Sequence, residues 1–174
     1  MNEQGLSTIE LDGVRFIAPP GWSREIEHSE DGVLCSMQST GVTFAIVGIY
    51  PDGGDPDDLV EEALDSLRQE HPSLEVDDWD ESDPEDPIQT LEAVFMSLDM
   101  VSYCWLRAWE VGARMVLVMV QSIEPEAERG RLVFRALCQS MQSTGETDDE
   151  HHERMGKGAA DGNGRSGRNR EELK

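Results

Sequence analysis

Hydrophobic side chains recur with two different periods along the first 142 residues, and each period predicts one kind of element. Alternation of apolar and polar residues is typical of strands, and a repeat every three to four residues is typical of helices. The pattern predicts strands over residues 9–18 (with a turn at Asp12-Gly13), 23–27, 33–38, 42–50, 74–76, 91–100, 101–110 and 114–121. Residues 42–50 and 114–121 are apolar in both alternation classes, which indicates central strands covered on both faces.

Two helices are predicted between and after these strands. Asp55 is a good N-cap and Pro56 suits the first helical position, so the first helix starts there and ends at His71-Pro72. The second helix opens at Pro125 and ends near Ser140. The two helices share an apolar stripe at helical spacing: Leu59, Val60, Ala63, Leu64 and Leu67 in the first, and Leu132, Val133, Ala136 and Leu137 in the second.

Short connections between most strands predict an antiparallel meander. The expected fold class is α+β, with a meander sheet of about six to seven strands and helices packed on both faces, an α/β/α sandwich. Residues 1–142 form this domain. From Ser143 the periodicity vanishes, so residues 143–174, Gly-rich and charged, are expected to be a disordered tail.

The charge of the chain is strongly acidic, with a net value of −23. Residues 1–142 carry 29 acidic and 8 basic residues, and all eight are arginine. Such a surface repels nucleic acid and anionic membranes, so neither is expected as a partner. A surface without lysine is also typical of salt-adapted proteins, and this interpretation stays open beside that of an acidic protein from an ordinary source.

Localisation is expected to be cytoplasmic. The N-terminal residues have neither a basic nor an apolar signal segment. The longest strongly apolar run, Met115 to Val120, is far shorter than the ~20 residues that a membrane span needs. Cys35, Cys104 and Cys138 lie in apolar segments and are predicted to be small buried hydrophobes without disulfides.

The usual catalytic and nucleotide-binding motifs are absent, among them GxGxxG, GxxxxGK[ST], HExxH, CxxC and GxSxG. The acidic residues 77–86 lack the alternation around a glycine that a calcium loop needs, and they are expected to form a solvated loop. Asp99 is predicted to serve a turn, and His151-His152 is interpreted as a solvated pair. We therefore expect no enzyme, no cofactor and no metal.

One strand carries a candidate partner-binding set. Tyr103, Trp105, Arg107 and Trp109 share a face of the predicted strand 101–110, and aromatic and arginine side chains concentrate binding energy at interfaces. Two interpretations stay open: the second helix covers this face and the tryptophans are core, or the face is a partly open apolar groove. Full burial of both tryptophans would exclude the groove.

A rival hypothesis from another class is a small-ligand carrier or enzyme. It would use a pocket between helix and sheet in which Arg107 or Arg114 anchors an anion; the simpler alternative is an ion pair with a nearby carboxylate. A purely structural domain is the third hypothesis.

The order of elements, together with Pro20-Gly21-Trp22, Leu64-x-x-Leu67-Arg68 and the spacing of Phe134 to Ser140, resembles the PsbP/Mog-like α/β/α sandwich superfamily, including its bacterial branch of domains of unknown function. The resemblance covers about residues 8–142. It implies a non-enzymatic binding protein, since members include photosystem II extrinsic subunits, a transport cofactor that binds a small GTPase, and chaperones that shield apolar helices. The chain departs from the photosynthetic members in lacking lysine-rich surfaces.

These observations lead to one main hypothesis: a non-catalytic, cytoplasmic binding or chaperone-like module. A face or edge of its sheet would accept an apolar or basic segment of a protein partner. The module itself is expected to be a monomer or a weak homodimer.

Overall fold

The structure is a computed structural model that describes residues 7–51, 53–78 and 90–145. In this part of the chain two helices and ten strands follow one another in the order β1 (Ser7–Leu11), β2 (Val14–Ala18), β3 (Ser23–His28), β4 (Val33–Gln38), β5 (Phe44–Tyr50), α1 (Pro56–Glu70), β6 (Glu75–Asp78), β7 (Leu91–Ser97), β8 (Met100–Val111), β9 (Arg114–Ile123), α2 (Ala127–Ser140) and β10 (Gln142–Ser143).

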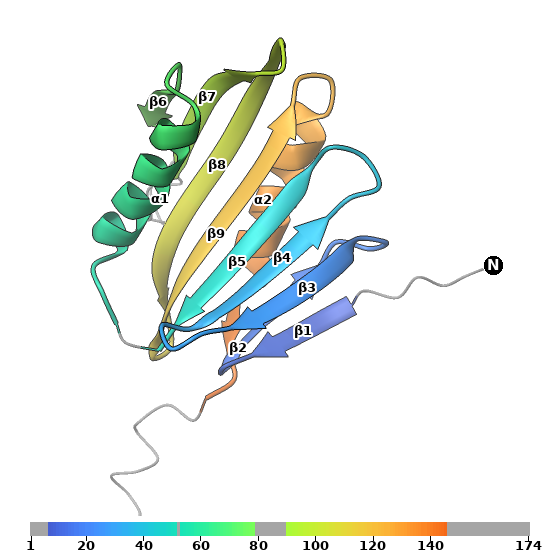
Figure 1. Cartoon of the computed structure of the whole chain (residues 1–174). Helices are drawn as coiled ribbons and strands as arrows, with labels where there is room; N and C mark the ends of the chain where they lie inside the picture. Colours follow the sequence, from blue (N-terminus) through green and yellow to red (C-terminus); the bar gives the residue numbers. More distant parts are fainter. Residues whose placement is uncertain (1–6, 52, 79–89, 146–174) are drawn as a thin grey trace, which may run out of the picture.

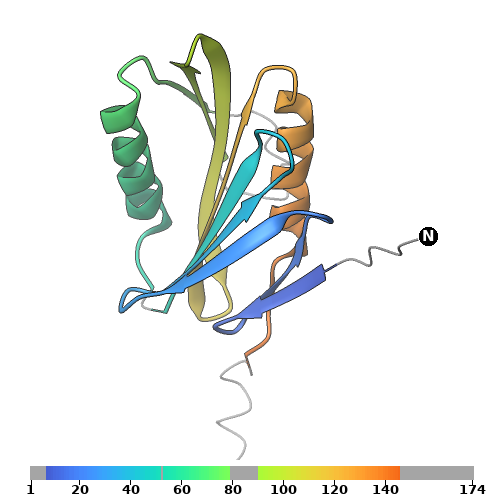
Figure 2. The same ribbon diagram turned by 45° about the vertical axis from the view of Figure 1, so that its right-hand side comes forward.

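Seven of the strands form one antiparallel sheet in the order β3-β4-β5-β9-β8-β7-β6 (Figure 1). It consists of two meanders, β3-β4-β5 and β6-β7-β8-β9, which meet where β5 pairs with β9, from Phe44 opposite Gln121 to Tyr50 opposite Met115. These two strands are the ones that the sequence predicts to be central, and the structure confirms their position. It also confirms the predicted class, an α+β fold with one helix on each face of an antiparallel sheet (Figure 2).

A second, three-stranded sheet in the order β1-β2-β10 was not predicted as a separate unit. The hairpin β1-β2 turns at Asp12-Gly13, as expected, and Gly13 has the positive φ of 83° that such a turn requires. The short strand β10 pairs Gln142 with Arg15 and Ser143 with Val14, just where the sequence periodicity vanishes. A two-residue strand leaves no periodic signal, so the sequence could not reveal it.

Helix α1 begins where its capping signals predict. The side chain of Asp55 accepts a hydrogen bond of 3.0 Å from the backbone N–H of Asp57, and Pro56 is the first helical residue. At the other end the N–H of His71 bonds the carbonyl of Leu67 and closes the helix. Leu64 and Leu67 are buried against the sheet, as the apolar stripe predicts.

Helix α2 begins later than predicted. The sequence places its start at Pro125, but residues 124–126 form a turn in which Glu126 N–H bonds the carbonyl of Ile123 at 2.9 Å, and the helix starts at Ala127. The Glu126 side chain accepts a bond of 3.0 Å from the buried hydroxyl of Thr43. The N-cap residue Glu126 therefore bonds Thr43, just before β5, and its side chain makes no capping hydrogen bond to the backbone of α2.

The core falls into two clusters, one on each face of the large sheet. The larger cluster lies on the side of α2 and is closed by the small sheet; its most deeply buried side chains include Phe16, Val47, Trp105, Phe134 and Leu137. The smaller cluster lies under α1 and consists of Leu64, Leu67, Ala93, Phe95, Cys104 and Leu106. Cys35, Cys104 and Cys138 are buried and form no disulfide with one another, as predicted.

Two predictions fall on residues outside the described part of the chain. The acidic loop predicted over 77–86 lies there except for its first two residues, which belong to β6. The tail predicted over 143–174 also lies there beyond residue 145. The boundary at 142 shifts in one respect, because Ser143 is the last residue of β10.

Candidate functional site

The strand register shows that α1 covers only part of its face of the large sheet. Its core cluster contains residues of β7, β8 and β9 but, among the described residues, none of β4 or β5. On β4 and β5 the burial alternates: Cys35, Ala45 and Val47 on the α2 side are buried, whereas Leu34 and Ile46 on the α1 side are half-buried. Figure 1 shows this half of the sheet without a helix in front of it.

We define the open face as the half-buried side chains that β4, β5 and β9 present on the α1 side. Register places Ser36 opposite Ile46 and Ile46 opposite Met119, so these side chains form a row across three strands. The members of the open face are Leu34, Ser36, Phe44, Ile46, Met119 and Gln121, of which Met119 stands at the margin because it also packs against the cluster beneath α1. Four of the six are apolar, so the open face is a largely hydrophobic floor in contact with solvent.

Acidic side chains border the open face on both sides. On β3, Glu25 pairs with Ser36 and Glu27 with Leu34, so both glutamates lie on the α1 side, and both are exposed. On the opposite border stands α1, whose exposed Glu62 lies near Tyr50. The open face is therefore an apolar strip with two exposed glutamates along β3 and Glu62 of α1 on the opposite side.

Tyr50 closes one end of the open face. Its ring lies over Gly48, where a Cβ atom would come within 2.7 Å of the tyrosine hydroxyl oxygen. Burial raises the pKa of this phenol, and the negative charges of Glu62 and Asp31 raise it further. A carboxylate-rich border thus disfavours a second negative charge here and favours a positive one.

The four residues that the sequence predicts as a partner-binding set lie on the other face of the sheet, toward α2. They differ in how deeply they are buried. Trp105 is 2% exposed and belongs to the larger core cluster. Its indole Nε1 donates a hydrogen bond of 2.6 Å to Glu92 Oε2. Above it lies Gly130 of α2, where an added Cβ would come within 3.0 Å of the tryptophan ring.

Tyr103, Arg107 and Trp109 are half-buried. Tyr103 stacks on Trp105 with ring centroids 6.1 Å apart and planes 8° apart, and the Arg107 guanidinium lies 4.8 Å from the centroid of the Trp109 ring. The Arg107–Trp109 pair is thus a cation–π contact. Full burial of both tryptophans would have excluded a groove on this face. Trp105 is fully buried but Trp109 is only half-buried, so partner binding by this set stays a prediction.

Arg114, the second candidate anion anchor, is engaged within the chain. Its Nε donates a hydrogen bond of 2.9 Å to the carbonyl of Asp12 and lies 3.2 Å from the carboxylate of the same residue. This is the ion pair that the sequence analysis held as the simpler alternative.

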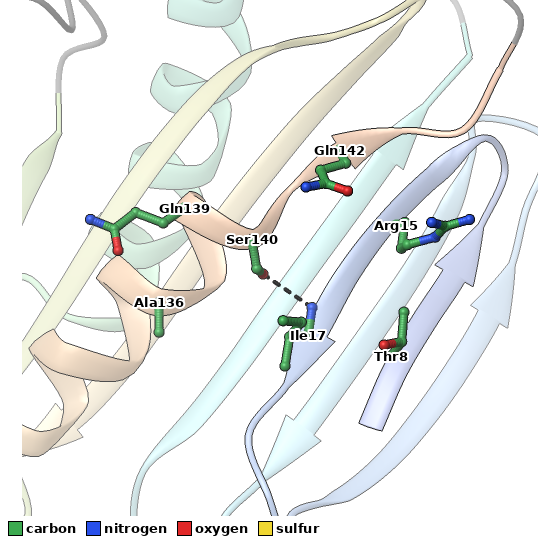
Figure 3. Close-up of a pocket in the computed structure, with 7 residues that line it drawn as sticks. All are labelled: Thr8, Arg15, Ile17, Ala136, Gln139, Ser140 and Gln142. Carbon is green, nitrogen blue, oxygen red and sulfur yellow. Dashed lines mark hydrogen bonds between the residues drawn. The ribbon is translucent and has the colours of Figure 1, made fainter. Parts of the chain in front are cut away.

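A pocket of about 530 Å³ lies elsewhere, on the outer side of the small sheet beside the end of α2 (Figure 3). Its lining consists of Thr8, Arg15, Ile17, Ala136, Gln139, Ser140 and Gln142. Ser140 Oγ accepts a bond of 3.0 Å from the backbone N–H of Ile17, and Arg15 pairs with Glu10 at 3.2 Å. The charge of Arg15 is thus already matched, and neither Arg107 nor Arg114 lines the pocket.

Within the described residues, no group of three or more histidine, cysteine or carboxylate side chains is arranged to hold a metal ion. In the same part of the chain no helix is long and apolar enough to cross a membrane.

Sequence reasoning missed the open face, because it predicted that strand 42–50 is covered on both sides. The prediction is wrong for the α1 side, since α1 lies over β7, β8 and β9 instead. A signal was present in the preceding strand, where positions 34, 36 and 38 run Leu, Ser, Gln, an unusually polar series for a covered face. A second missed feature is Leu98, which is 89% exposed with a φ of 50° in the predicted turn beside Asp99.

Comparison with known proteins supports the fold. No protein-family model matches the chain, and no curated protein matches its sequence. The structure is similar to the solution structure of PsbP (CyanoP) from the cyanobacterium Synechocystis sp. PCC 6803, with a TM-score of 0.56 and 13% identity over 82% of this chain and 94% of that one. The chain therefore has a PsbP-like fold.

Proposed function

We propose that this protein is a non-catalytic binding module whose open face accepts an apolar segment of a partner protein flanked by basic residues. The observation that carries the proposal is the apolar strip of β4 and β5, which α1 leaves uncovered and Met119 of β9 continues, with exposed glutamates on either side. An apolar floor supplies most of the binding free energy, and the carboxylates select partners by charge.

Two further observations support a binding role over a catalytic one. The open face contains no histidine, cysteine or lysine, and its polar members are one serine and one glutamine. Burial is the main cause of the raised pKa of Tyr50, and the charges of Glu62 and Asp31, which raise it further, would favour a positive charge nearby. The PsbP-like fold agrees with a protein that assembles with others, which is the implication of the resemblance noted from the sequence.

The test uses the full chain and a synthetic amphipathic peptide of leucine and lysine. A peptide with the same lysines but serine in place of leucine is the matched control for charge. Fluorescence anisotropy is expected to show binding of the leucine peptide and much weaker binding of the serine peptide. Failure of the leucine peptide to bind at any ionic strength would contradict the proposal.

Two variants locate the binding surface. Phe44→Thr combined with Ile46→Thr keeps good strand formers while removing apolar area, and is expected to weaken binding about tenfold, or about 1.4 kcal/mol. Ile17→Thr, which removes an exposed isoleucine from the outer side of the small sheet, is expected to leave binding unchanged. If Tyr103→Ser weakened binding and the open-face pair did not, the aromatic face would be the site instead.

A further inference from the structure

We propose that the open face is occupied in cis by the chain's own basic stretch, residues 154–170. This inference rests on the proposed function of the open face as a surface for basic and apolar segments. It goes further in naming an occupant, which partners would have to displace.

Charge complementarity is the first argument. Residues 154–170 contain five basic residues and a single acidic one, Asp161, whereas residues 146–153 before them contain five acidic residues and no basic one. They follow a domain in which acidic residues outnumber basic ones by 29 to 8 over positions 1–142. The only two lysines of the chain, Lys157 and Lys174, also lie beyond residue 145.

The second argument is where the described chain ends. Thr144 N–H bonds the carbonyl of Gly13 at 2.8 Å, and Ser143 lies against Gly112 in the β8–β9 turn. Three residues beyond Gly112, Met115 pairs with Tyr50, which closes one end of the open face. The path from the end of the described chain to the open face is thus about 10 Å along β9 and about 5 Å across to β5.

The length of chain available matches this distance. Nine residues, the number from 146 to Arg154, would span roughly 16 Å (root-mean-square) as a random coil and about 30 Å at full extension. The basic stretch therefore reaches the open face without straining its connection. A tether of this length gives an effective concentration in the millimolar range.

The chemistry of the two surfaces also fits. Arginine and lysine can lay their aliphatic stems along an apolar floor while their charged ends reach carboxylates at its border. On the open face the floor is provided by Phe44, Ile46 and Met119, and the carboxylates by Glu25, Glu27 and Glu62. Five glycines between residues 154 and 170 allow the backbone to lie close to the sheet.

The unusual distribution of lysine makes the test direct. A carbodiimide joins a lysine amine to a carboxylate that it touches, so in the full chain at low salt the linked lysines report where the stretch lies. Peptide mapping is expected to find Lys157 joined to Glu25, Glu27 or Glu62. The yield should fall several-fold between about 0.02 M and about 0.5 M salt, because the screening length shrinks from roughly 20 Å to roughly 4 Å.

Two variants of equal charge change provide the control. Glu25→Gln, Glu27→Gln and Glu62→Gln together should reduce the linking of Lys157 to the domain about fivefold or more. Glu10→Gln, Glu124→Gln and Glu128→Gln, on the small sheet and around the start of α2, should leave it nearly unchanged. Equal loss in both variants, or links spread over the whole domain, would overturn the proposal.

A second measurement separates this inference from the proposed function. Replacing Arg154, Lys157, Arg165, Arg168 and Arg170 by glutamine is expected to tighten binding of the leucine–lysine peptide about three- to tenfold, given a stretch that binds with a Kd on the order of 0.1–0.3 mM. If the peptide binds the open face with the same affinity in both proteins and Lys157 forms no link, the cis inference fails alone. If Lys157 links to the open face and no peptide binds either protein, the proposed function fails alone.

Discussion

The two faces of the large sheet differ in how completely they are covered. On the α2 side, a helix and a second sheet enclose a cluster of seventeen buried residues. On the α1 side, a single helix covers six buried residues and leaves β4 and β5 in contact with solvent. The difference teaches that the closed layer contributes most of the buried core, while the other layer leaves apolar surface in contact with solvent.

The largest expected effect tests whether the two core clusters contribute differently to stability. Phe134→Ala, in the closed cluster, should lower the free energy of unfolding by about 3–5 kcal/mol, because the surrounding layers cannot collapse into the cavity. Leu64→Ala, under α1, should cost about 2–3 kcal/mol, because a helix with one free flank can move inward.

Urea unfolding followed by circular dichroism measures both changes. A loss at Leu64 as large as that at Phe134 would show that the two layers contribute alike. The comparison of the two faces would then fail.

A smaller effect concerns how closely α2 approaches the sheet. A Cβ added at Gly130 would come within 2.7 Å of the Ser122 Cβ and 3.0 Å of the Trp105 ring. Gly130→Ala should therefore destabilise the protein by about 1–2 kcal/mol, although alanine favours a helix by about 1 kcal/mol. The shift of the urea midpoint measures it.

The control for Gly130 is Gly54→Ala, before α1, where an added Cβ meets nothing within 4 Å. Its expected effect is within about 0.5 kcal/mol of zero. A stabilised Gly130→Ala variant would mean that α2 can lift from the sheet without loss, contrary to the view of a tightly closed layer.

The smallest expected effect is the pH dependence of the free energy of unfolding that the buried thiols cause. It compares how well the two core clusters exclude water. Burial raises the pKa of the thiol of Cys104, under α1, and that of Cys35, on the α2 side, above the ordinary value of 9.0. A raised folded-state pKa means that the unfolded chain releases these protons first as pH rises. The stability is thus complete below about pH 9 and falls above it, by at most about 1.4 kcal/mol per pH unit for each thiol.

Unfolding in urea at pH 8, 9 and 10 measures this slope. Each substitution removes one buried thiol. Cys104→Ala and Cys35→Ala should therefore each make the free energy of unfolding fall less steeply with pH, by the contribution of the thiol removed. If the pH dependence were the same in Cys104→Ala as in the unchanged protein, water would have to reach the cluster beneath α1 as well as the open face.

Local signals in the sequence predicted the elements well. Asp55 and Pro56 mark the start of α1, and the doubly apolar runs place β5 and β9 at the centre of the sheet, because caps and apolar runs are local features of the sequence. The cover that the same run predicted on both faces of β5 is missing on the α1 side. The position of a helix across the face of a sheet cannot be predicted from such local signals. The lateral position of α1 depends on packing between distant segments, so the open face was not predicted.

The candidate site shows the same limit. The shared face of Tyr103, Trp105, Arg107 and Trp109 follows from strand alternation, and the Arg107–Trp109 contact agrees with it. The burial of Trp105 depends instead on Gly130, which lies 25 positions further along the chain and lets α2 approach. Residue type and spacing therefore identified the face, and only the fold could tell its core member from its accessible ones.

The pairing of β5 with β9 has a consequence for how the molecule forms. Each meander can assemble from neighbouring hairpins on the microsecond scale, whereas joining the two requires closing the whole chain between Tyr50 and Met115. Contacts between segments so far apart in sequence slow folding. Until they form, both central strands expose apolar side chains and unpaired backbone, so a newly made chain is most prone to aggregate before its two halves meet.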